Sequence, residues 1–200
     1  MKTSQRTVLL ALLGALVVLL PACTTNTQGD DANPVFLTAE FTLAPLSKNV
    51  NDGTALQIQT ITLRNRVKGA TPVTTQFLDI QCDSYTVVWT RIDGGKTASP
   101  PQSFGCNVIV PFNSTSSLSN FPVMSAGELL LSPLDRLFPF NGGFDPETGK
   151  AEIRQTATVT FYGHLLSGPA IASVPATLDM IFIFQPLAGR VETSRVSRVR

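Results

Sequence analysis

Few side chains in this sequence could perform acid–base, nucleophilic or metal chemistry. His164 is the only histidine, so a Ser-His-acid triad would have to use it, and a metal site would depend on carboxylates. His164 shares the outward face of a predicted strand with Tyr162, which favours a surface histidine. The chain has no Gly-x-Ser-x-Gly, Walker A, His-Glu-x-x-His or Cys-x-x-Cys motif. The sequence therefore predicts a non-enzymatic protein with no catalytic residues, no cofactor and no metal site.

Two carboxylates, Asp145 and Glu147, stand close together in the segment Phe-Asp-Pro-Glu-Thr-Gly-Lys. Their oxygens could contribute to a Ca²⁺ site, which takes about six to eight oxygen ligands. The Asp-Pro and Thr-Gly pairs are equally typical of a tight turn between strands, and Lys150 offsets the negative charge. We expect a turn here.

Cys23 follows an N-terminal segment with the pattern of an export signal. Lys2 and Arg6 precede an apolar run over residues 8–20, which is too short for a membrane span of about 20 apolar residues. The run ends in Leu-Pro-Ala-Cys, which resembles the lipobox of bacterial lipoproteins. The middle position of that motif usually holds a small or β-branched residue, whereas this chain has Pro21.

The lipobox resemblance implies a location and no activity. It implies that residues 1–22 are a cleaved signal peptide and that Cys23 carries a diacylglycerol and palmitate. Thr24 in the following position, rather than Asp, goes with sorting to the outer membrane. Two or more acyl chains hold a protein firmly on a membrane, since each buried methylene contributes about 0.8 kcal/mol. We therefore expect a lipid anchor in the cell envelope.

The other two cysteines, Cys82 and Cys106, could pair with each other. Exported proteins meet oxidising conditions in which disulfides persist. In the chain-entropy model, closing a loop of this length is worth roughly 3 kcal/mol. We expect one disulfide between them.

The chain divides by composition into a tether, a domain and a tail. Residues 23–34 are polar and without aromatic side chains, which is typical of a disordered tether between a lipidated cysteine and a folded domain. Residues 35–188 are expected to form the domain, and residues 189–200 a basic, disordered tail rich in arginine. The formal net charge is only +1, so nothing indicates nucleic acid as a partner.

The domain sequence has the two-residue period of β-strands. Alternating apolar residues predict strands over 35–43, 56–63, 73–80, 85–92, 108–112, 157–164 and 178–184, with turn signals at Asp52-Gly53 and Asp93-Gly94. The apolar phase slips between Ile58 and Ile61, which indicates a bulge. The fold class is therefore all-β, an antiparallel β-sandwich of about seven to nine strands. The pattern looks like the immunoglobulin or fibronectin-III type of sandwich, although the spacing of the cysteines differs from the immunoglobulin framework.

The segment 121–144 is the most unusual part of the domain. It is long, rich in Phe, Leu, Pro and Gly, and without a strand or helix period, and such connections are often either functional or part of the packing. It either caps the open end of the sandwich or presents an apolar surface to a partner or a greasy ligand. The candidate binding residues are Phe121, Leu134, Phe138, Phe140 and Phe144.

These observations lead to two functional hypotheses. The first is a lipid-anchored, non-enzymatic cell-envelope protein that acts as an interaction or assembly module, with the membrane and a possible envelope protein as partners. The alternative is a binder of a small apolar ligand in a pocket lined by residues 121–144, which predicts a concave and partly dry cavity.

Overall fold

The computed structural model describes residues 33–43, 47–69 and 76–186. The chain divides into two units, 1–32 and 33–200, and all described residues belong to the second. The predicted signal peptide, Cys23, most of the tether and the basic tail lie outside the described residues. Among the described residues, no helix is long and apolar enough to cross a membrane.

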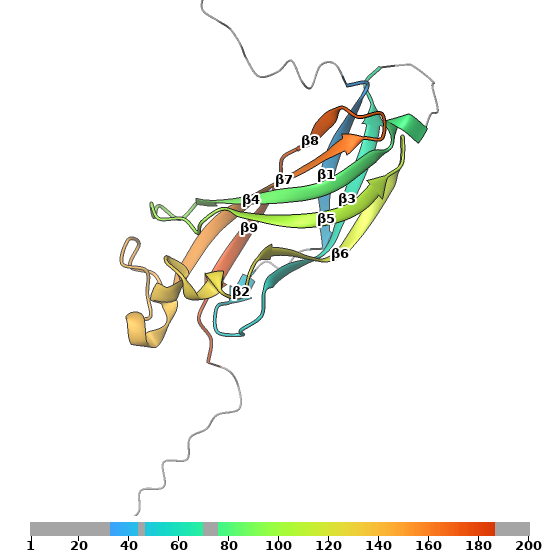
Figure 1. The fold of residues 1–200 in the computed structure, drawn as a ribbon. Helices are drawn as coiled ribbons and strands as arrows, with labels where there is room; N and C mark the ends of the chain where they lie inside the picture. Colours follow the sequence, from blue (N-terminus) through green and yellow to red (C-terminus); the bar gives the residue numbers. More distant parts are fainter. Residues whose placement is uncertain (1–32, 44–46, 70–75, 187–200) are drawn as a thin grey trace, which may run out of the picture. The chain divides into compact units, whose positions relative to one another are not determined.

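The described part of the chain is all-β, as the sequence predicts, and its strands form two layers (Figure 1). The nine strands are β1 (Val35–Leu43), β2 (Ser47–Asn49), β3 (Leu56–Val67), β4 (Ile80–Arg91), β5 (Gln102–Val110), β6 (Thr115–Met124), β7 (Glu152–Leu165), β8 (Ala170–Val174) and β9 (Ala176–Ile183). One layer contains β6, β3 and β1, and the other contains β5, β4, β7, β9 and β2. Strand β8 pairs with both β7 and β1, so it joins the two layers along one side of the sandwich.

Most strand pairs are antiparallel, which agrees with the prediction, but two short pairings are parallel. Strand β8 meets β1 in parallel at only two residue pairs, and β2 meets β9 in parallel at three. The long antiparallel ladders β4–β7, β3–β6 and β1–β3 carry the architecture.

The core lies between the two layers and is centred on aromatic rings. The rings of Tyr85 and Phe121 lie 4.0 Å apart, and each lies 5.3 Å from the ring of Phe161. The Tyr85 hydroxyl, which is buried, donates a hydrogen bond to the carbonyl of Pro122 at 2.7 Å. Burying the ring therefore leaves no unpaired hydroxyl.

The strand faces follow the predicted alternation. In β7, Val159 and Phe161 are buried and Tyr162 is exposed. In β3, burial changes phase between Ile58 and Ile61, where the sequence indicates a bulge. One predicted strand is partly wrong: in 73–80, Gln76–Leu78 form a 3-10 turn, η1, and β4 begins only at Ile80.

Strands β4 and β7 approach each other closely at a bulge. The register shifts between Cys82 and Ser84, and Gly163 of β7 lies opposite Cys82. A Cβ atom on Gly163 would lie 2.0 Å from the carbonyl oxygen of Gln81 and 2.9 Å from the Cα of Cys82. Only glycine fits this position, since backbone atoms cannot move aside as a side chain can.

Candidate functional site

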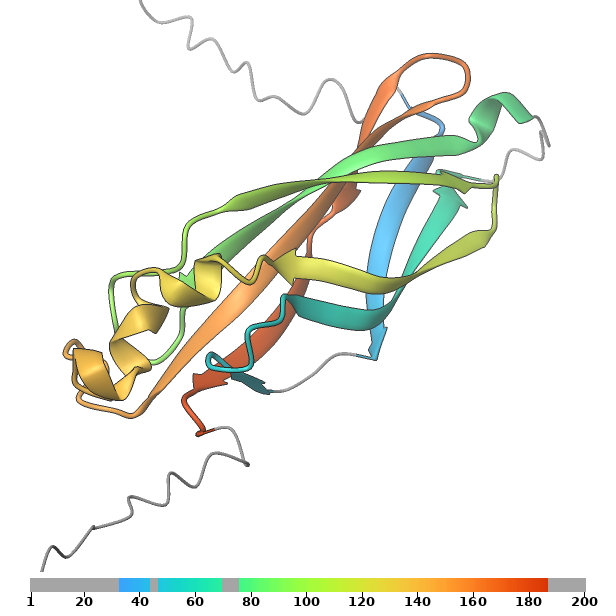
Figure 2. The ribbon, with the colours of Figure 1, turned by 60° about the horizontal axis from the view of Figure 1, so that its bottom comes forward.

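The segment 125–150 between β6 and β7 forms one end of the sandwich, which we call the tip. It contains three single-turn 3-10 helices, η2 (Glu128–Leu130), η3 (Leu134–Leu137) and η4 (Pro139–Asn141). Figure 2 shows these turns gathered together at the end of β6, beside the start of β7. The tip contains most of the segment 121–144 that the sequence singles out.

The tip closes the end of the core with part of its apolar side chains. Leu129, Leu134 and Leu137 are fully buried, and Phe138 is only 6% exposed. The ring of Phe138 lies 5.4 Å from that of Phe184 in an edge-on arrangement. These residues are therefore packing residues.

The remaining apolar side chains of the tip face solvent. We call them the tip surface, and they are Leu130 (60% exposed), Leu131 (51%), Phe140 (81%) and Phe144 (48%). The ring of Phe140 rests at 5.3 Å from that of the buried Phe138, so it is supported from below and free above. Four large apolar side chains exposed on one short segment are unusual for a soluble surface and are typical of an interaction site.

The candidate binding residues from the sequence therefore fall into two groups. Phe121 lies in the central core, and Leu134 and Phe138 lie beneath the tip, so none of these three presents its side chain to a partner. Phe140 and Phe144 do. The sequence reasoning missed Leu130 and Leu131. The signal was present, since three consecutive leucines, 129–131, cannot all point inward from one short turn.

A buried ion network holds the tip against the β4–β5 loop. The Arg91 guanidinium donates to Asp93 at 2.8 Å and 2.9 Å and to Asp145 at 2.6 Å. These three side chains are 2%, 1% and 0% exposed. Arg136 of η3 lies 3.5 Å from Asp145 and 3.2 Å from Glu147. The network ties strand β4 to the segment that leads back into β7.

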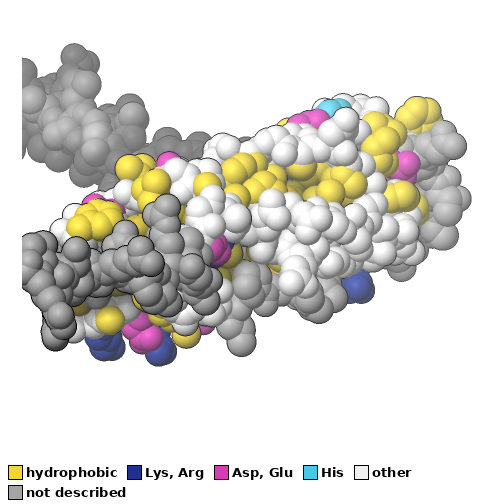
Figure 3. Space-filling model, turned by 90° about the horizontal axis from the view of Figure 1, so that it is seen from below, with side chains coloured by type: hydrophobic (Ala, Val, Ile, Leu, Met, Phe, Trp, Pro, Cys, Tyr) yellow, Lys and Arg dark blue, Asp and Glu magenta, His cyan; other side chains and the backbone are white. Residues whose placement is uncertain are grey.

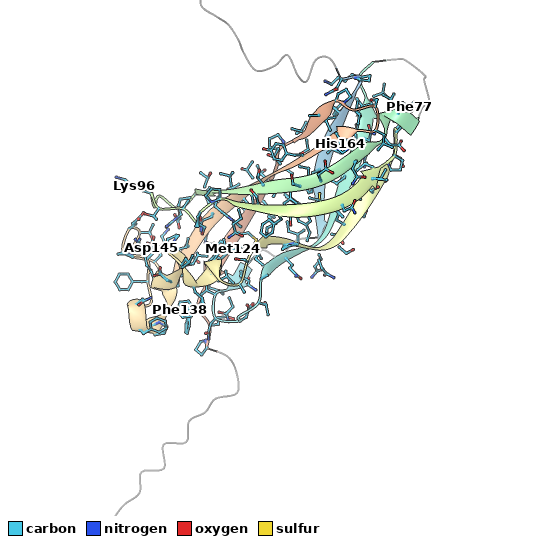
Figure 4. The ribbon with its side chains drawn as sticks, in the orientation of Figure 1. Phe77, Lys96, Met124, Phe138, Asp145 and His164 are labelled. Atoms are coloured by element: carbon cyan, nitrogen blue, oxygen red, sulfur yellow. The ribbon has the colours of Figure 1, made fainter. Side chains whose placement is uncertain are left out.

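Glu147 completes the connection on the outer side of the network. Its carboxylate accepts hydrogen bonds from the backbone N–H of Thr97 at 3.0 Å, from the N–H of Lys96 and from the Thr97 hydroxyl. Figure 4 shows Lys96, Asp145 and Phe138 at this same end of the sandwich. Ion pairs and hydrogen bonds therefore hold the segment that carries the tip surface against the β4–β5 loop.

The network also sets the charge states of its carboxyl groups. Burial opposes ionisation of Asp93, but the hydrogen bonds from Arg91 and from backbone N–H groups outweigh it and lower its pKa to about 2. The pKa of Asp145 is lowered in the same way, against burial, by Arg91 and Thr148. Hydrogen bonds from Thr97 and Lys96 lower the pKa of Glu147 to about 2. All three carboxyl groups are therefore anionic at neutral pH.

The segment 144–150 is a turn, the interpretation that the sequence favours over a Ca²⁺ site. Asp145 and Lys150 form an isolated antiparallel bridge, and the N–H groups of Thr148 and Gly149 donate to the Asp145 carbonyl. The Asp145 carboxylate is engaged by arginines and by the Thr148 hydroxyl at 2.9 Å. Among the described residues, no group of three or more His, Cys, Asp and Glu side chains could hold a metal ion.

His164 lies at the opposite end of the sandwich, near Phe77 (Figure 4). Its Nδ1 is 2.9 Å from the Asp83 carboxylate, and both side chains are about half exposed. A histidine and a carboxylate are two of the three members of a catalytic triad. Here Asp83 stands at the bulge of β4, and its side chain faces solvent. The expected surface position of His164 agrees with the structure.

Cys82 and Cys106 lie on neighbouring strands, with their sulfur atoms 3.2 Å apart as free thiols. The contact with Cys106, together with burial, raises the pKa of the Cys82 thiol. The contact between the two thiols lowers the pKa of Cys106 despite its partial burial. The structure brings the two predicted partners together, and the disulfide itself stays a prediction.

The alternative hypothesis of a ligand pocket lined by residues 121–144 stays a prediction. A shallow, open hollow of about 320 Å³ is lined by Lys150, Ala151, Glu152 and Ile183.

Comparison with known proteins gives no family for this chain. No protein-family model matches the sequence, and no curated protein matches it.

Proposed function

We propose that this protein is a lipid-anchored, non-enzymatic cell-envelope protein, and that its tip surface binds an envelope partner. In this proposal, residues 1–22 are a signal peptide and Cys23 carries the lipid that holds the chain on the outer membrane. The single observation that supports an interaction module is the tip surface, where Phe140 is 81% exposed.

The arrangement of the tip supports this role physically. A partner gains most from large apolar side chains that are already held in place, because little conformational entropy is lost on binding. Phe140 rests on the buried Phe138, and the ion network of Arg91 and Asp145 fixes the segment that carries Phe144. The surface is therefore organised before any partner arrives.

Site-specific crosslinking in the native cells tests the proposal. A photo-reactive amino acid is placed at position 140 and, as a matched control, at the exposed Ala172 of β8, which pairs with β7 near His164 at the opposite end of the sandwich. Captured material is purified through a tag in detergent and identified by mass spectrometry. We expect one stoichiometric envelope protein from position 140 and none from position 172.

Two variants separate binding from folding and from anchoring. In a protein that carries the photo-reactive amino acid at position 144, Phe140→Ser should abolish the crosslink to the partner. The variant should leave the melting temperature almost unchanged, because the Phe140 ring is exposed. Cys23→Ser should abolish incorporation of a clickable palmitate analogue and release the protein from the membrane fraction. Equal crosslinking from positions 140 and 172 would contradict the tip as the binding surface. Retained palmitate labelling in Cys23→Ser would contradict the anchor.

A further inference from the structure

The two layers of the sandwich are joined along one side and open along the other. On the joined side, β8 pairs with both β7 and β1. On the open side, the described residues pair β5 only with β4, and β6 only with β3. Strands β5 and β6 meet at the corner that joins them and then diverge (Figure 2). We call the gap between residues 103–108 and 117–123 the seam.

The seam exposes part of the apolar core. Phe104, Cys106 and Val108 point inward from β5, and Leu118 points inward from β6, and all four are only partly buried although they pack against core residues. Figure 3 shows a band of hydrophobic side chains on one face of the molecule, bordered by backbone and by side chains that are neither hydrophobic nor charged. If a further strand closed this side of the sandwich, it would cover these side chains.

One hydrogen bond bridges the two sides of the seam at each of its ends. At one end, the Ser116 hydroxyl donates to the carbonyl of Ile109 at 2.7 Å. At the other end, the N–H of Ser125 donates to the side-chain oxygen of Gln102 at 3.1 Å. The amide nitrogen of Gln102 is buried and has no hydrogen-bond partner among the described residues. The seam is therefore a slot of defined length with an unused donor at one end.

The two edges of the slot differ in their capacity to pair with another strand. In β6, Asn120 has a left-handed backbone (φ 52°) and Pro122 has no N–H, and both features interrupt pairing. Strand β5 is nine residues long and contains no proline and no left-handed residue, although its register with β4 shifts at Cys106 and Asn107. In an antiparallel ladder, the N–H and C=O groups of about every second residue face away from the paired neighbour. The outer edge of β5 therefore offers backbone donors and acceptors on either side of this bulge.

Natural edge strands are usually protected by lysine, proline, bulges or inward-pointing charges. Strand β5 has one bulge, at Cys106 and Asn107, but neither β5 nor β6 contains a Lys, Arg, Asp or Glu. We infer that the seam is a docking site for an extended, uncharged peptide strand that pairs with the free edge of β5. The strand adds to the sheet, and its inward side chains cover Phe104, Val108 and Leu118.

The lining of the seam defines the chemistry of this partner. Its inward-facing side chains, at every second position, must be apolar, because they enter the core between Val108 and Leu118. A charged side chain there would be buried without a counter-ion, which costs several kcal/mol. The partner is thus a segment of alternating apolar and small polar residues. This site lies on β5 and β6 and does not depend on the tip surface.

A fluorescent octapeptide of alternating Thr and Val tests this inference, with fluorescence anisotropy as the readout and the full chain as receptor. The wild type should bind it. Val108→Lys should weaken binding at least tenfold, because the lysine places an unpaired charge in the slot. Ile109→Lys is the matched control: it adds the same charge to the next residue, whose side chain faces outward, and should bind like the wild type. A peptide with proline at alternate positions should not bind, since proline has no N–H.

Further measurements keep the test decisive. Leu118→Lys places the charge on the opposite wall of the slot, and thermal melting shows which variants are folded. Hydrogen exchange of β5 amides should slow when the peptide binds the wild type. The inference is wrong if the wild type binds no peptide, or if folded Val108→Lys and Leu118→Lys both bind as the wild type does. It is also wrong if light scattering shows a wild-type dimer that Val108→Lys dissociates, since a second copy then fills the slot.

Discussion

Replacing Arg91 by methionine should lower the free energy of unfolding at pH 7 by about 3–5 kcal/mol, the usual result of removing one partner from a buried ion pair. Methionine keeps much of the length and apolar volume of the arginine stem. It removes the charge that compensates Asp93 and Asp145, which are 1% and 0% exposed. The loss comes from leaving the Asp93 carboxylate buried without a counter-ion and the Asp145 carboxylate with only the more distant Arg136, at 3.5 Å.

The pH dependence gives the prediction its sharper form. In the wild type, the pKa of Asp93 is about 2 in the folded state, against 3.8 for an unperturbed aspartate. A lowered folded pKa stabilises the protein above pH 3.8, and this stabilisation, about 2 kcal/mol, is lost as the pH falls through 2. In Arg91→Met, the hydrogen bonds from the backbone N–H groups of Gly95 and Arg154 remain, but the contribution of Arg91 is lost and the pKa of Asp93 rises from its wild-type value. Acidification then weakens the variant less than the wild type.

Urea denaturation of both proteins at pH 7, 5 and 3 measures this difference. The stability gap should be widest at pH 7 and should narrow by at least about 1 kcal/mol at pH 3. Arg154→Met is the matched control, because Arg154 pairs with Glu152 at 2.8 Å on the surface, where a pair is worth about 0–1 kcal/mol. Equal losses in the two variants, or a gap that stays constant with pH, would refute the reasoning.

Three further predictions concern packing, the bulge and the thiols. Phe138→Ala should lower stability by about 3–5 kcal/mol, measured by denaturation, because the ring is buried under the tip; a loss below 1 kcal/mol would show that the tip is not part of the core. Gly163→Ala should cost about 1–3 kcal/mol, since its Cβ would collide with backbone, whereas Gly105→Ala, whose Cβ meets nothing within 4 Å, is the control. In protein from an oxidising compartment, the intact mass after alkylation should show that Cys82 and Cys106 are bridged. Chemical reduction of this disulfide should lower the free energy of unfolding by roughly 3 kcal/mol. An unchanged melting temperature after reduction would contradict a structural disulfide.

Much of the fold can be predicted from the sequence because a strand buried on one face carries its own signal. The alternation around Val159 and Phe161 identifies the central strand β7 and its inward face, and the turn residues mark where such strands end. The sequence analysis missed three strands, β2, β6 and β8. Strands β2 and β8 have only three and five residues, so their alternation is too short to identify them. The first half of β6 is rich in serine, since one side faces solvent and the other lines the open seam, so it lacks the apolar alternation that identifies β7.

The candidate site could be predicted only in part. The composition of 121–144 indicates an unusual apolar segment, but Phe138 and Phe140 have the same side chain and lie two residues apart. One is buried and the other is exposed because the 3-10 turns rotate successive side chains by about 120°, so no strand or helix period applies. The ion network was equally hidden, since Arg91 and Asp145 are 54 residues apart in the chain.

The sequence by itself determined the local properties of this protein: the strands with one apolar face, the turns, and the lipobox pattern that predicts the anchor at Cys23. These depend on neighbouring residues and on backbone geometry. Only the tertiary structure decided which phenylalanines reach solvent, which charges are buried together and which strand edges stay unpaired. Those features depend on contacts between distant segments, such as β8 joining the two layers on one side while β5 and β6 stay apart on the other.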